Sequence, residues 1–522
     1  MDRAKMIDRV RARTKPWDIV IIGGGATGMG CAVDAASRGY EVLLLEQHDF
    51  GKGTSSRSTK LVHGGVRYLE QGNISLVMEA LKERGILRQN APHLVYDLAF
   101  IVPNYDWWEM PFYGVGLKVY DLLATKYRFG RSQMLSKEET LKRLPTIKTE
   151  GLRGGVIYYD GQFDDTRLLI SLARTAVEHG ATVLNYTRVF GFRKNAHSMI
   201  DAVNFSGEET GQVFRVGAKV VINATGAFCD SVRQIADPES EKLIAPSQGI
   251  HIVLDRSFLP SDSAIMIPRT DDGRVLFAIP WHGHTLVGTT DTPVNEIELE
   301  PKALDEEIEF ILHTSQKYLH KPPIREDILS VFTGIRPLVK EGGQKNPANT
   351  AALSRDHTIE INNAGLLTVT GGKWTTYRRM AEDAVNQALM LADLPEKPCV
   401  TKELKIQGFI EDASGLGDLA HYGSDASEIK KMMALDERLA EKLHPKLSYT
   451  IAEVIWAVRN EMARTVEDVL ARRTRALFLD AKAAIEIAPK VAAVMAEELD
   501  KDEDWQTQQV ESFNKVAQNY CV

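Results

Sequence analysis

The chain has 522 residues, of which 44% are hydrophobic and 26% are charged, and its formal net charge is −8. This length predicts two or three domains, and the composition is typical of a globular protein. The negative charge argues against a nucleic-acid partner, which normally requires a broad basic surface. The four cysteines are scattered without a CxxC pair, so we expect a reducing compartment, no disulfide framework and no metal site.

The first sixteen residues carry six Lys or Arg and two Asp, and they lack the apolar core of a signal peptide. No uninterrupted apolar run approaches the roughly eighteen residues that span a membrane. We therefore expect the protein in the cytoplasm or on the cytoplasmic face of a membrane. The basic arm is expected to be a frayed, solvated tail, with contact to anionic lipid as the alternative.

A nucleotide-binding βαβ unit is predicted next. Trp17–Ile22 reads as a buried parallel strand, and it continues into Gly23-Gly-Gly-Ala-Thr-Gly28, which fits G-x-G-x-x-G. The small residues from Met29 to Arg38 predict a helix, and residues 41–45 predict a second strand that ends on Glu46. These features indicate a dinucleotide site, because a strand, a glycine loop, a helix, a second strand and a terminal acid follow one another in register.

Each residue of this motif has a separate role. Gly23 permits the tight turn, Gly25 lets the backbone approach a pyrophosphate, and Gly28 lets the helix pack on the strand. The free N–H groups at the helix start, beside Ala26 and Thr27, favour phosphate. Glu46 is placed to accept the ribose hydroxyls.

The following loop favours FAD over NAD. Residues 49–60 are rich in Gly and Ser and lead into His63-Gly-Gly-Val-Arg-Tyr68. Such a loop can line the pyrophosphate and ribityl chain of a longer cofactor that reaches deep into the protein.

Residues 106–126 predict a surface helix. Trp107, Trp108 and Tyr113 precede a stretch in which Lys118, Asp121 and Thr125 share one face and most other positions are apolar. Clustered aromatic residues beside an amphipathic stretch are typical of a helix at a membrane interface. A helix buried between domains is the alternative.

Two later segments complete the predicted elements. Leu366–Thr370 reads as a strand, followed by a Gly371-Gly372 turn and a helix from Thr375 onward. After the Pro-containing linker at 394–398, residues such as 451–479 form helices and contain few breakers.

Several strings resemble the FAD-dependent glycerol-3-phosphate dehydrogenases, which are flavoproteins of the glycine-oxidase/D-amino-acid-oxidase type. The resemblance extends over most of the chain, in the family's order. Its segments are 54–70, 221–226, 249–251, 280–281, 288–291, 334–337, 354–356, 371–377, 461–470 and 472–474. Ala26, Thr27, Met29 and Arg57 are not the commonest residues at their positions, which leaves the contacts around Arg57 open.

The resemblance implies an α/β fold with a Rossmann-like FAD-binding domain, a mixed-sheet substrate domain and a helical C-terminal cap domain. We expect the oxidoreductase region at 17–393. Its FAD-binding pieces are expected at 17–87, 163–230 and 333–393, its substrate domain at 88–162 and 231–332, and the helical domain at 399–522.

The implied reaction oxidises sn-glycerol 3-phosphate to dihydroxyacetone phosphate by hydride transfer from C2 to FAD N5. The electrons would then pass to a membrane quinone, from a homodimer bound peripherally to the cytoplasmic face of the inner membrane. A glycerophosphate oxidase, which reduces O2 to H2O2, would use the same substrate residues; the oxidases carry an insertion that this chain lacks. The same nucleotide unit would also serve an FAD-dependent amine or amino-acid oxidase, or a non-catalytic redox-sensing flavoprotein.

The implied substrate site must hold a dianionic phosphate, which the planar fork of arginine suits. By resemblance, Arg67, Arg336 and Arg355 bind the substrate, with Tyr68 and Lys373 beside them, and Arg336 also takes part in catalysis.

His251 is our first choice for the general base. It lies in a predicted strand at 248–253, and histidine titrates near the working pH. A core histidine satisfied by a backbone carbonyl is the alternative, while His63 is expected to shape the flavin loop.

Cofactor contacts are expected from the glycine loop, the serine loop and three returning segments. The helix start after Gly371-Gly372 would face the flavin edge where negative charge gathers on reduction. The expected residues are Gly23, Gly25, Ala26, Thr27, Gly28, Glu46, Ser55, Ser56, Lys60, Leu61, His63, Gly64, Val189, Ala224, Thr225, Gly226, Gly372, Lys373, Thr375 and Thr376.

Overall fold

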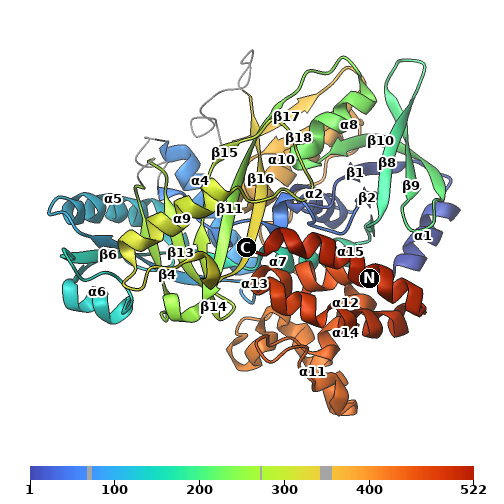
Figure 1. Cartoon of the computed structure of the whole chain (residues 1–522). Helices are drawn as coiled ribbons and strands as arrows, with labels where there is room; N and C mark the ends of the chain where they lie inside the picture. The colour runs from blue at the N-terminus through green and yellow to red at the C-terminus, as the bar shows by residue number, and fades with distance from the viewer. Residues whose placement is uncertain (67–72, 271–272, 341–355) are drawn as a thin grey trace.

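The computed structural model describes residues 1–66, 73–270, 273–340 and 356–522. Two sheets and a helical C-terminal region make up these residues (Figure 1). This confirms the predicted α/β class with a Rossmann-like unit, a mixed sheet and a helical C-terminal part.

The first sheet has the order β17-β18-β10-β1-β2-β7, and β8 and β9 extend it beyond β10. Its strands from β18 to β7 are parallel, and β17 is antiparallel to β18. Apolar side chains on α2, α7 and α10 pack with these strands in one core. The strands are β1 (Trp17–Ile22), β2 (Val42–Leu45), β7 (Thr182–Leu184), β8 (Thr187–Lys194), β9 (Ile200–Gly207), β10 (Val213–Asn223), β17 (His357–Ile361) and β18 (Leu366–Gly371).

The second sheet has the order β15-β11-β14-β13-β12-β4-β6-β3, with β16 paired to β11 and β5 paired to β6. It is mixed, because β12 and β4 are parallel while the other neighbours are antiparallel. Its strands are β3 (Leu61–Val62), β4 (Val95–Asn104), β5 (Gln133–Ser136), β6 (Gly154–Phe163), β11 (Ile244–Asp255), β12 (Ser263–Ile267), β13 (Leu276–Trp281), β14 (His284–Gly288), β15 (Thr292–Pro293) and β16 (Ile328–Val339).

The helices follow the same division, with the C-terminal ones packed together below the sheets (Figure 1). Those of the sheet regions are α1 (Arg3–Ala12), α2 (Ala26–Ser37), α4 (Ile74–Asn90), α5 (Glu109–Ala124), α6 (Lys137–Arg143), α7 (Asp165–Glu178), α8 (Cys229–Ala236), α9 (Asp305–Tyr318) and α10 (Tyr377–Leu391). The C-terminal helices are α11 (Ala426–Leu435), α12 (Ile451–Glu461), α13 (Ala476–Leu479), α14 (Ala481–Leu499) and α15 (Glu503–Ala517).

The N-terminal arm differs from its prediction. Residues 3–12 form α1 rather than a frayed tail, and Met6 and Val10 are buried beneath it. Arg3 bonds Asn185 and pairs with Glu209, which fixes the helix to the end of the first sheet. The basic residues that suggested a solvated arm thus serve in part as local ion-pair partners.

The predicted helical run 451–479 is interrupted. α12 ends where Met462 adopts a left-handed φ of 56°, and a π-helix at Asp468–Arg473 follows. Arg475, with φ 63°, then precedes α13. Side-chain composition predicts helix here, but buried ion pairs of this segment with the nucleotide unit select the broken path.

The predicted domain boundaries remain predictions, and some strands do not follow them. β3 lies inside the expected first FAD-binding piece but pairs with β6 of the second sheet. β16 starts before residue 333 and pairs along its length with β11. The two sheets therefore share segments close to the site.

Candidate functional site

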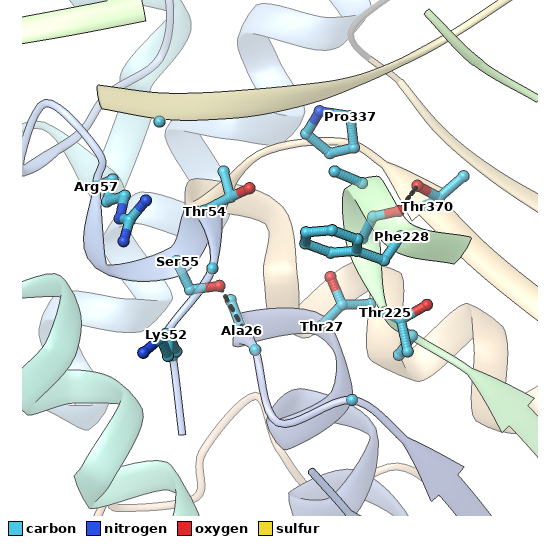
Figure 2. A pocket seen from close by; sticks show the side chains of 18 of the residues that line it. Ala26, Thr27, Lys52, Thr54, Ser55, Arg57, Thr225, Phe228, Pro337 and Thr370 are labelled. Atoms are coloured by element: carbon cyan, nitrogen blue, oxygen red, sulfur yellow. Dashed lines mark hydrogen bonds between the residues drawn. The ribbon is translucent and has the colours of Figure 1, made fainter. Parts of the chain in front are cut away.

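A cavity of about 660 Å³ lies beyond the carboxyl ends of β1, β2, β10 and β18. Ligands of open α/β sheets bind at this edge, where loops leave the strands. Figure 2 shows side chains from the glycine loop, the serine loop and the β10–α8 connection around it, with Pro337 and Thr370 contributed by later segments.

Two glycines of the glycine loop, Gly23 and Gly28, leave no room for a side chain. Gly23 has a φ of 108°, and a Cβ there would lie 2.6 Å from the carbonyl oxygen of Ala224. A Cβ on Gly28 would lie 1.9 Å from the carbonyl oxygen of Gly23. α2 therefore begins directly against the strand end, with its first N–H groups beside the cavity, as phosphate binding requires.

Glu46 ends the second strand on the cavity wall. Its carboxylate accepts hydrogen bonds from the N–H groups of Gly24, at 2.6 Å, and His48, at 2.9 Å. Burial raises the pKa of this carboxyl, and the two backbone N–H groups oppose that shift. The site therefore presents an acceptor oriented by backbone, which fits a ribose diol next to a phosphate cradle.

The serine loop has a cavity face and a buried face. Thr54, Ser55, Arg57, Ser58 and Thr59 line the cavity. Ser55 accepts a hydrogen bond from the N–H of Ala26 at 2.9 Å, which ties this loop to the start of α2 (Figure 2).

Lys60 occupies the buried face. It is fully buried, and its ammonium donates to Asp165 at 2.6 Å and to the carbonyl of Ser56 at 2.7 Å. The structure therefore holds Lys60 behind the loop and does not place it on the cavity wall, since a buried ammonium requires a carboxylate partner.

The described structure brings most of the predicted cofactor residues to one cavity. Those on its wall are Gly23, Gly25, Ala26, Thr27, Glu46, Ser55, Leu61, His63, Val189, Ala224, Thr225, Gly226, Gly372, Lys373 and Thr375. Gly28, Ser56, Lys60, Gly64 and Thr376 are not among the lining residues; the Gly64 N–H donates to Tyr120 instead. The predicted substrate residues Arg67, Tyr68 and Arg355 lie outside the described residues.

The predicted turn after β18 is present, but the helix begins later. Gly371 and Gly372 both have positive φ, 78° and 67°. A single 3-10 turn, Trp374–Thr376, then precedes α10, which starts at Tyr377 rather than Thr375. Thr375 accepts a hydrogen bond from the N–H of His63 at 3.2 Å, so this turn also fixes the loop that leads out of β3.

A second cavity of about 210 Å³ adjoins the first. Thr59, Leu61, His63 and Arg336 line both cavities. The remaining wall of the smaller cavity comes from the second sheet, with charged residues such as Arg274 and Asp291 and apolar residues such as Phe277. Arg336, a predicted substrate residue, lies at the junction between the cavities, and Lys373 lies on the wall of the larger one.

His251 lies on β11, on the wall of the larger cavity beside Thr59 of the junction. Its Nε2 is 2.9 Å from the hydroxyl of Thr59, and its ring stacks on Phe332 at a centroid distance of 5.0 Å. Burial lowers the pKa of His251 well below its usual range, and Lys60 and Arg336 lower it further. The ring is therefore neutral at physiological pH and can accept a proton, and its partner is a hydroxyl rather than the backbone carbonyl of the alternative interpretation.

Arg336 lies on β16, opposite β11. Its guanidinium donates to the carbonyl of Thr290 at 2.7 Å and pairs with Asp291 at 3.2 Å. These bonds orient the planar group toward both cavities, where it can bind an oxyanion. Lys373 lines the larger cavity nearby, so two cationic side chains of the predicted substrate set face this region.

Some lining residues were missed by sequence reasoning. Lys52, Phe228, Pro337 and Thr59 line the cavity without having been predicted as site residues. Thr59 lies within the serine loop that favoured FAD, so its position was a usable signal. Phe228 lies just after the quoted motif 221–226 and Pro337 ends the motif 334–337, but their orientation depends on the sheet.

α5 carries an exposed apolar surface. Trp108, Phe112, Val115, Val119 and Leu122 are exposed, at helical spacing, while Leu117 and Tyr120 pack inward. This arrangement is that of a surface helix and not of a helix buried between domains, within the chain as described. No described helix is long and apolar enough to cross a membrane.

Comparisons with known proteins agree along the chain. A model of the FAD dependent oxidoreductase family matches residues 18–378, and a model of the C-terminal domain of alpha-glycerophosphate oxidase matches residues 399–506. A mitochondrial glycerol-3-phosphate dehydrogenase of Homo sapiens is 40% identical over 536 residues, covering 96% of this chain and 73% of that protein. One from Arabidopsis thaliana is 39% identical, covering 97% and 86%.

Solved structures show the same fold. The glycerol-3-phosphate dehydrogenase of Bacillus halodurans, complexed with FAD, has a TM-score of 0.80 at 28% identity and covers 100% of this chain and 98% of that one. The L-alpha-glycerophosphate oxidase of Mycoplasma pneumoniae has a TM-score of 0.57 at 19% identity, covering 75% and 98%, which shows shared fold alone.

Proposed function

This chain belongs to the family of FAD-dependent glycerol-3-phosphate dehydrogenases, and on that premise we propose that it oxidises sn-glycerol 3-phosphate to dihydroxyacetone phosphate and passes the electrons to a membrane quinone. Its cofactor is FAD. The observation that carries the proposal is the junction at which His251 and Arg336 meet the cofactor cavity.

The cavity residues fit FAD. The glycine cradle and the start of α2 would hold the pyrophosphate, and Glu46 would hold the ribose. The remaining length of the cavity, between the serine loop and the Gly371-Gly372 turn, would hold the rest of the cofactor. The bound flavin supplies the acceptor for the hydride that leaves C2 of the substrate.

The protein residues supply placement and proton transfer. Arg336 would bind the substrate phosphate or its neighbouring oxygen through its planar fork, with Lys373 adding positive charge. His251, neutral because its pKa is lowered, would accept the proton of the C2 hydroxyl as that carbon is oxidised. Arg67, Tyr68 and Arg355 remain proposed substrate ligands by resemblance.

The direct test is anaerobic addition of glycerol 3-phosphate to the purified, FAD-loaded protein. Loss of the oxidised flavin absorbance is expected, and dihydroxyacetone phosphate should accumulate in equal amount. An unchanged flavin spectrum would contradict the proposal. Bleaching by an amino acid instead would favour an amine or amino-acid oxidase.

The quinone acceptor is proposed from the resemblance seen in the sequence and from α5. The exposed apolar side chains on this helix fit peripheral attachment to a membrane, where a quinone is available. Cytoplasmic-face attachment and a homodimer remain predictions.

O2 is the competing electron acceptor, because a glycerophosphate oxidase shares the fold. Parallel assays of quinone-analogue reduction and peroxide formation under air separate the two. Quinone reduction with little peroxide is expected, whereas stoichiometric peroxide without quinone activity would favour the oxidase.

A further inference from the structure

The junction between the two cavities contains a second polar group that the proposed reaction does not yet use. Thr59 lines both cavities, and its hydroxyl oxygen is 2.9 Å from Nε2 of His251. The other ring nitrogen, Nδ1, is buried and has no hydrogen-bond partner in the described part of the structure. The Thr59 hydroxyl is thus the hydrogen-bond partner that the structure gives to this imidazole.

Phe332 and the strand β14 contact the ring by packing. Phe332 of β16 stacks on one face, with an interplanar angle of 15°. A Cβ on Gly288 of β14 would lie 2.2 Å from the ring, so that strand packs directly against it. These contacts set the plane of the imidazole, while the hydroxyl of Thr59 fixes the direction of Nε2 within that plane.

Thr59 is itself held from the buried side of its loop. Asp165 accepts hydrogen bonds from both the N–H and the hydroxyl of Ser58, at 3.2 and 2.7 Å. Lys60 and Arg475 both donate to the carbonyl of Ser56, at 2.7 and 2.8 Å. The residues on both sides of Thr59 are therefore fixed to fully buried groups, and the position of its hydroxyl is determined before a ligand binds.

We propose that Thr59 is a positioning residue for His251, whose hydroxyl orients Nε2 before the substrate binds and accepts from it after the imidazole has taken the substrate proton. A hydroxyl can donate to the neutral nitrogen and, after rotation, accept from the protonated one. When the substrate binds, its C2 hydroxyl takes over the single lone pair of Nε2 and the Thr59 hydroxyl turns aside; the proton then passes to Nε2, and the Thr59 oxygen accepts from the new N–H without backbone movement. This inference rests on the proposed function, because it concerns the base of that reaction.

Two charged groups that face His251 affect its pKa. Lys60, from the serine loop, and Arg336, from β16, both disfavour the imidazolium. Burial lowers the pKa of Lys60 itself to about 7, so its own titration also falls within the pH range of the assay. Hydrogen bonds to charged groups are the stronger ones, so an accepting hydroxyl favours imidazolium and raises the pKa of His251 relative to a methyl group.

The test compares Thr59→Val, which keeps the shape, with Thr59→Ser, which keeps the hydroxyl. Both are loaded with FAD and mixed anaerobically with glycerol 3-phosphate in stopped flow across a range of pH. Thr59→Val should lower the maximal rate of flavin bleaching by about tenfold, as expected for one lost hydrogen bond, and shift the acid limb of the profile to lower pH. Thr59→Ser should retain the wild-type acid limb and most of the rate. Lys60 is unchanged in both, so its titration does not distinguish them.

Thr285→Val is the matched control. Thr285 is a fully buried threonine on β14 whose hydroxyl donates to the carbonyl of Asp255, away from both cavities. Its rate and profile should equal those of the wild type.

Equal losses in Thr59→Val and Thr59→Ser without a shift of the acid limb would overturn the positioning role, and so would a wild-type rate in Thr59→Val. The FAD content and flavin spectrum of each variant are measured alongside, so that a folding defect is recognised. Failure of the wild type to bleach would instead contradict the proposed function.

Discussion

On the first sheet, part of the cavity wall comes from the stretch 22–46, where the glycine loop admits no side chain at Gly23, and residues of β8, the β10–α8 connection and β18 complete it. On the second sheet, the wall comes from β11 and β16, and presents the side chains of His251 and Arg336. The first wall therefore depends on the absence of side chains and the second on their identity. Binding of the cofactor and rate of reaction should respond separately to substitution.

A second difference lies in how the walls are supported. Behind the first wall, Asp49 is held by Arg472, at 2.6 Å, and by Arg473, at 2.7 Å, both from the C-terminal region. Arg167 of α7 forms a two-point ion pair with Glu461 at the end of α12. The second wall is supported instead by the ladder between β11 and β16. A substitution that removes one of these buried charges should therefore reduce cofactor binding at the first wall more than the reaction rate at the second.

The largest expected effect is at Gly28. An alanine there would place its Cβ within 1.9 Å of backbone, so α2 would have to move away from the strand end. We expect Gly28→Ala to be purified without FAD, as measured by the flavin absorbance per protein. Gly415→Ala, where a Cβ would meet nothing within 4 Å, should retain FAD. An FAD-loaded Gly28→Ala protein would contradict the assignment of the cradle.

His251→Asn tests the second wall alone. Removal of a general base should slow anaerobic flavin bleaching by about 10²- to 10⁴-fold, because proton transfer in the transition state is lost. The FAD content should stay at the wild-type value, since the glycine cradle is untouched. Loss of FAD together with the rate would show that the two walls are not separable.

Glu461→Gln tests the support of the first wall. Arg167 holds the pKa of Glu461 down, from an ordinary value near 4.5 to about 2, against the opposing effect of burial. Because the folded pKa is the lower one, this stabilisation is present above about pH 4.5 and is lost as the pH falls through 2. The shift corresponds to about 3 kcal/mol of unfolding free energy at pH 7, which denaturant titration of Glu461→Gln should show as a loss.

The acid dependence gives the sharper outcome for that variant. Wild-type stability should fall between pH 4.5 and pH 2 by more than that of Glu461→Gln, so the two curves converge at low pH. A constant difference between them at all pH values would contradict the ion-pair explanation. The rate of bleaching in the FAD-loaded fraction should be unchanged.

The smallest effect on chemistry is expected at α5. Phe112→Ser or Leu122→Ser should leave FAD content and bleaching unchanged. Each should lower partition to phospholipid vesicles by about ten- to a hundredfold, since a buried apolar side chain is worth roughly 1.5–3 kcal/mol. Leu435→Ser is the control, because Leu435 is an exposed leucine on α11, well away from α5 (Figure 1). Vesicle binding that is unaffected by the α5 substitutions would remove this helix from the proposed membrane contact.

Local sequence patterns predicted the elements of the first wall well. β1 has the predicted bounds 17–22, and Glu46 ends the second strand on the cavity wall, because these features depend on apolar runs and glycine sterics. The cofactor FAD and the family followed from motifs of the same kind. Pattern failed where packing overrode it, at α1, whose buried Met6 gave no local signal, and at Met462 and Arg475, whose left-handed backbone interrupts a helix-forming segment.

The sequence by itself determined the dinucleotide cradle, the family and the residue types of the site, since each depends on short spacing within one stretch of chain. Only the tertiary structure decided which of those residues share a wall. It placed Lys60 behind the loop on Asp165, and it brought Thr59 to His251, which is 192 positions away. Contacts of that separation depend on how two sheets meet, and no local propensity encodes them.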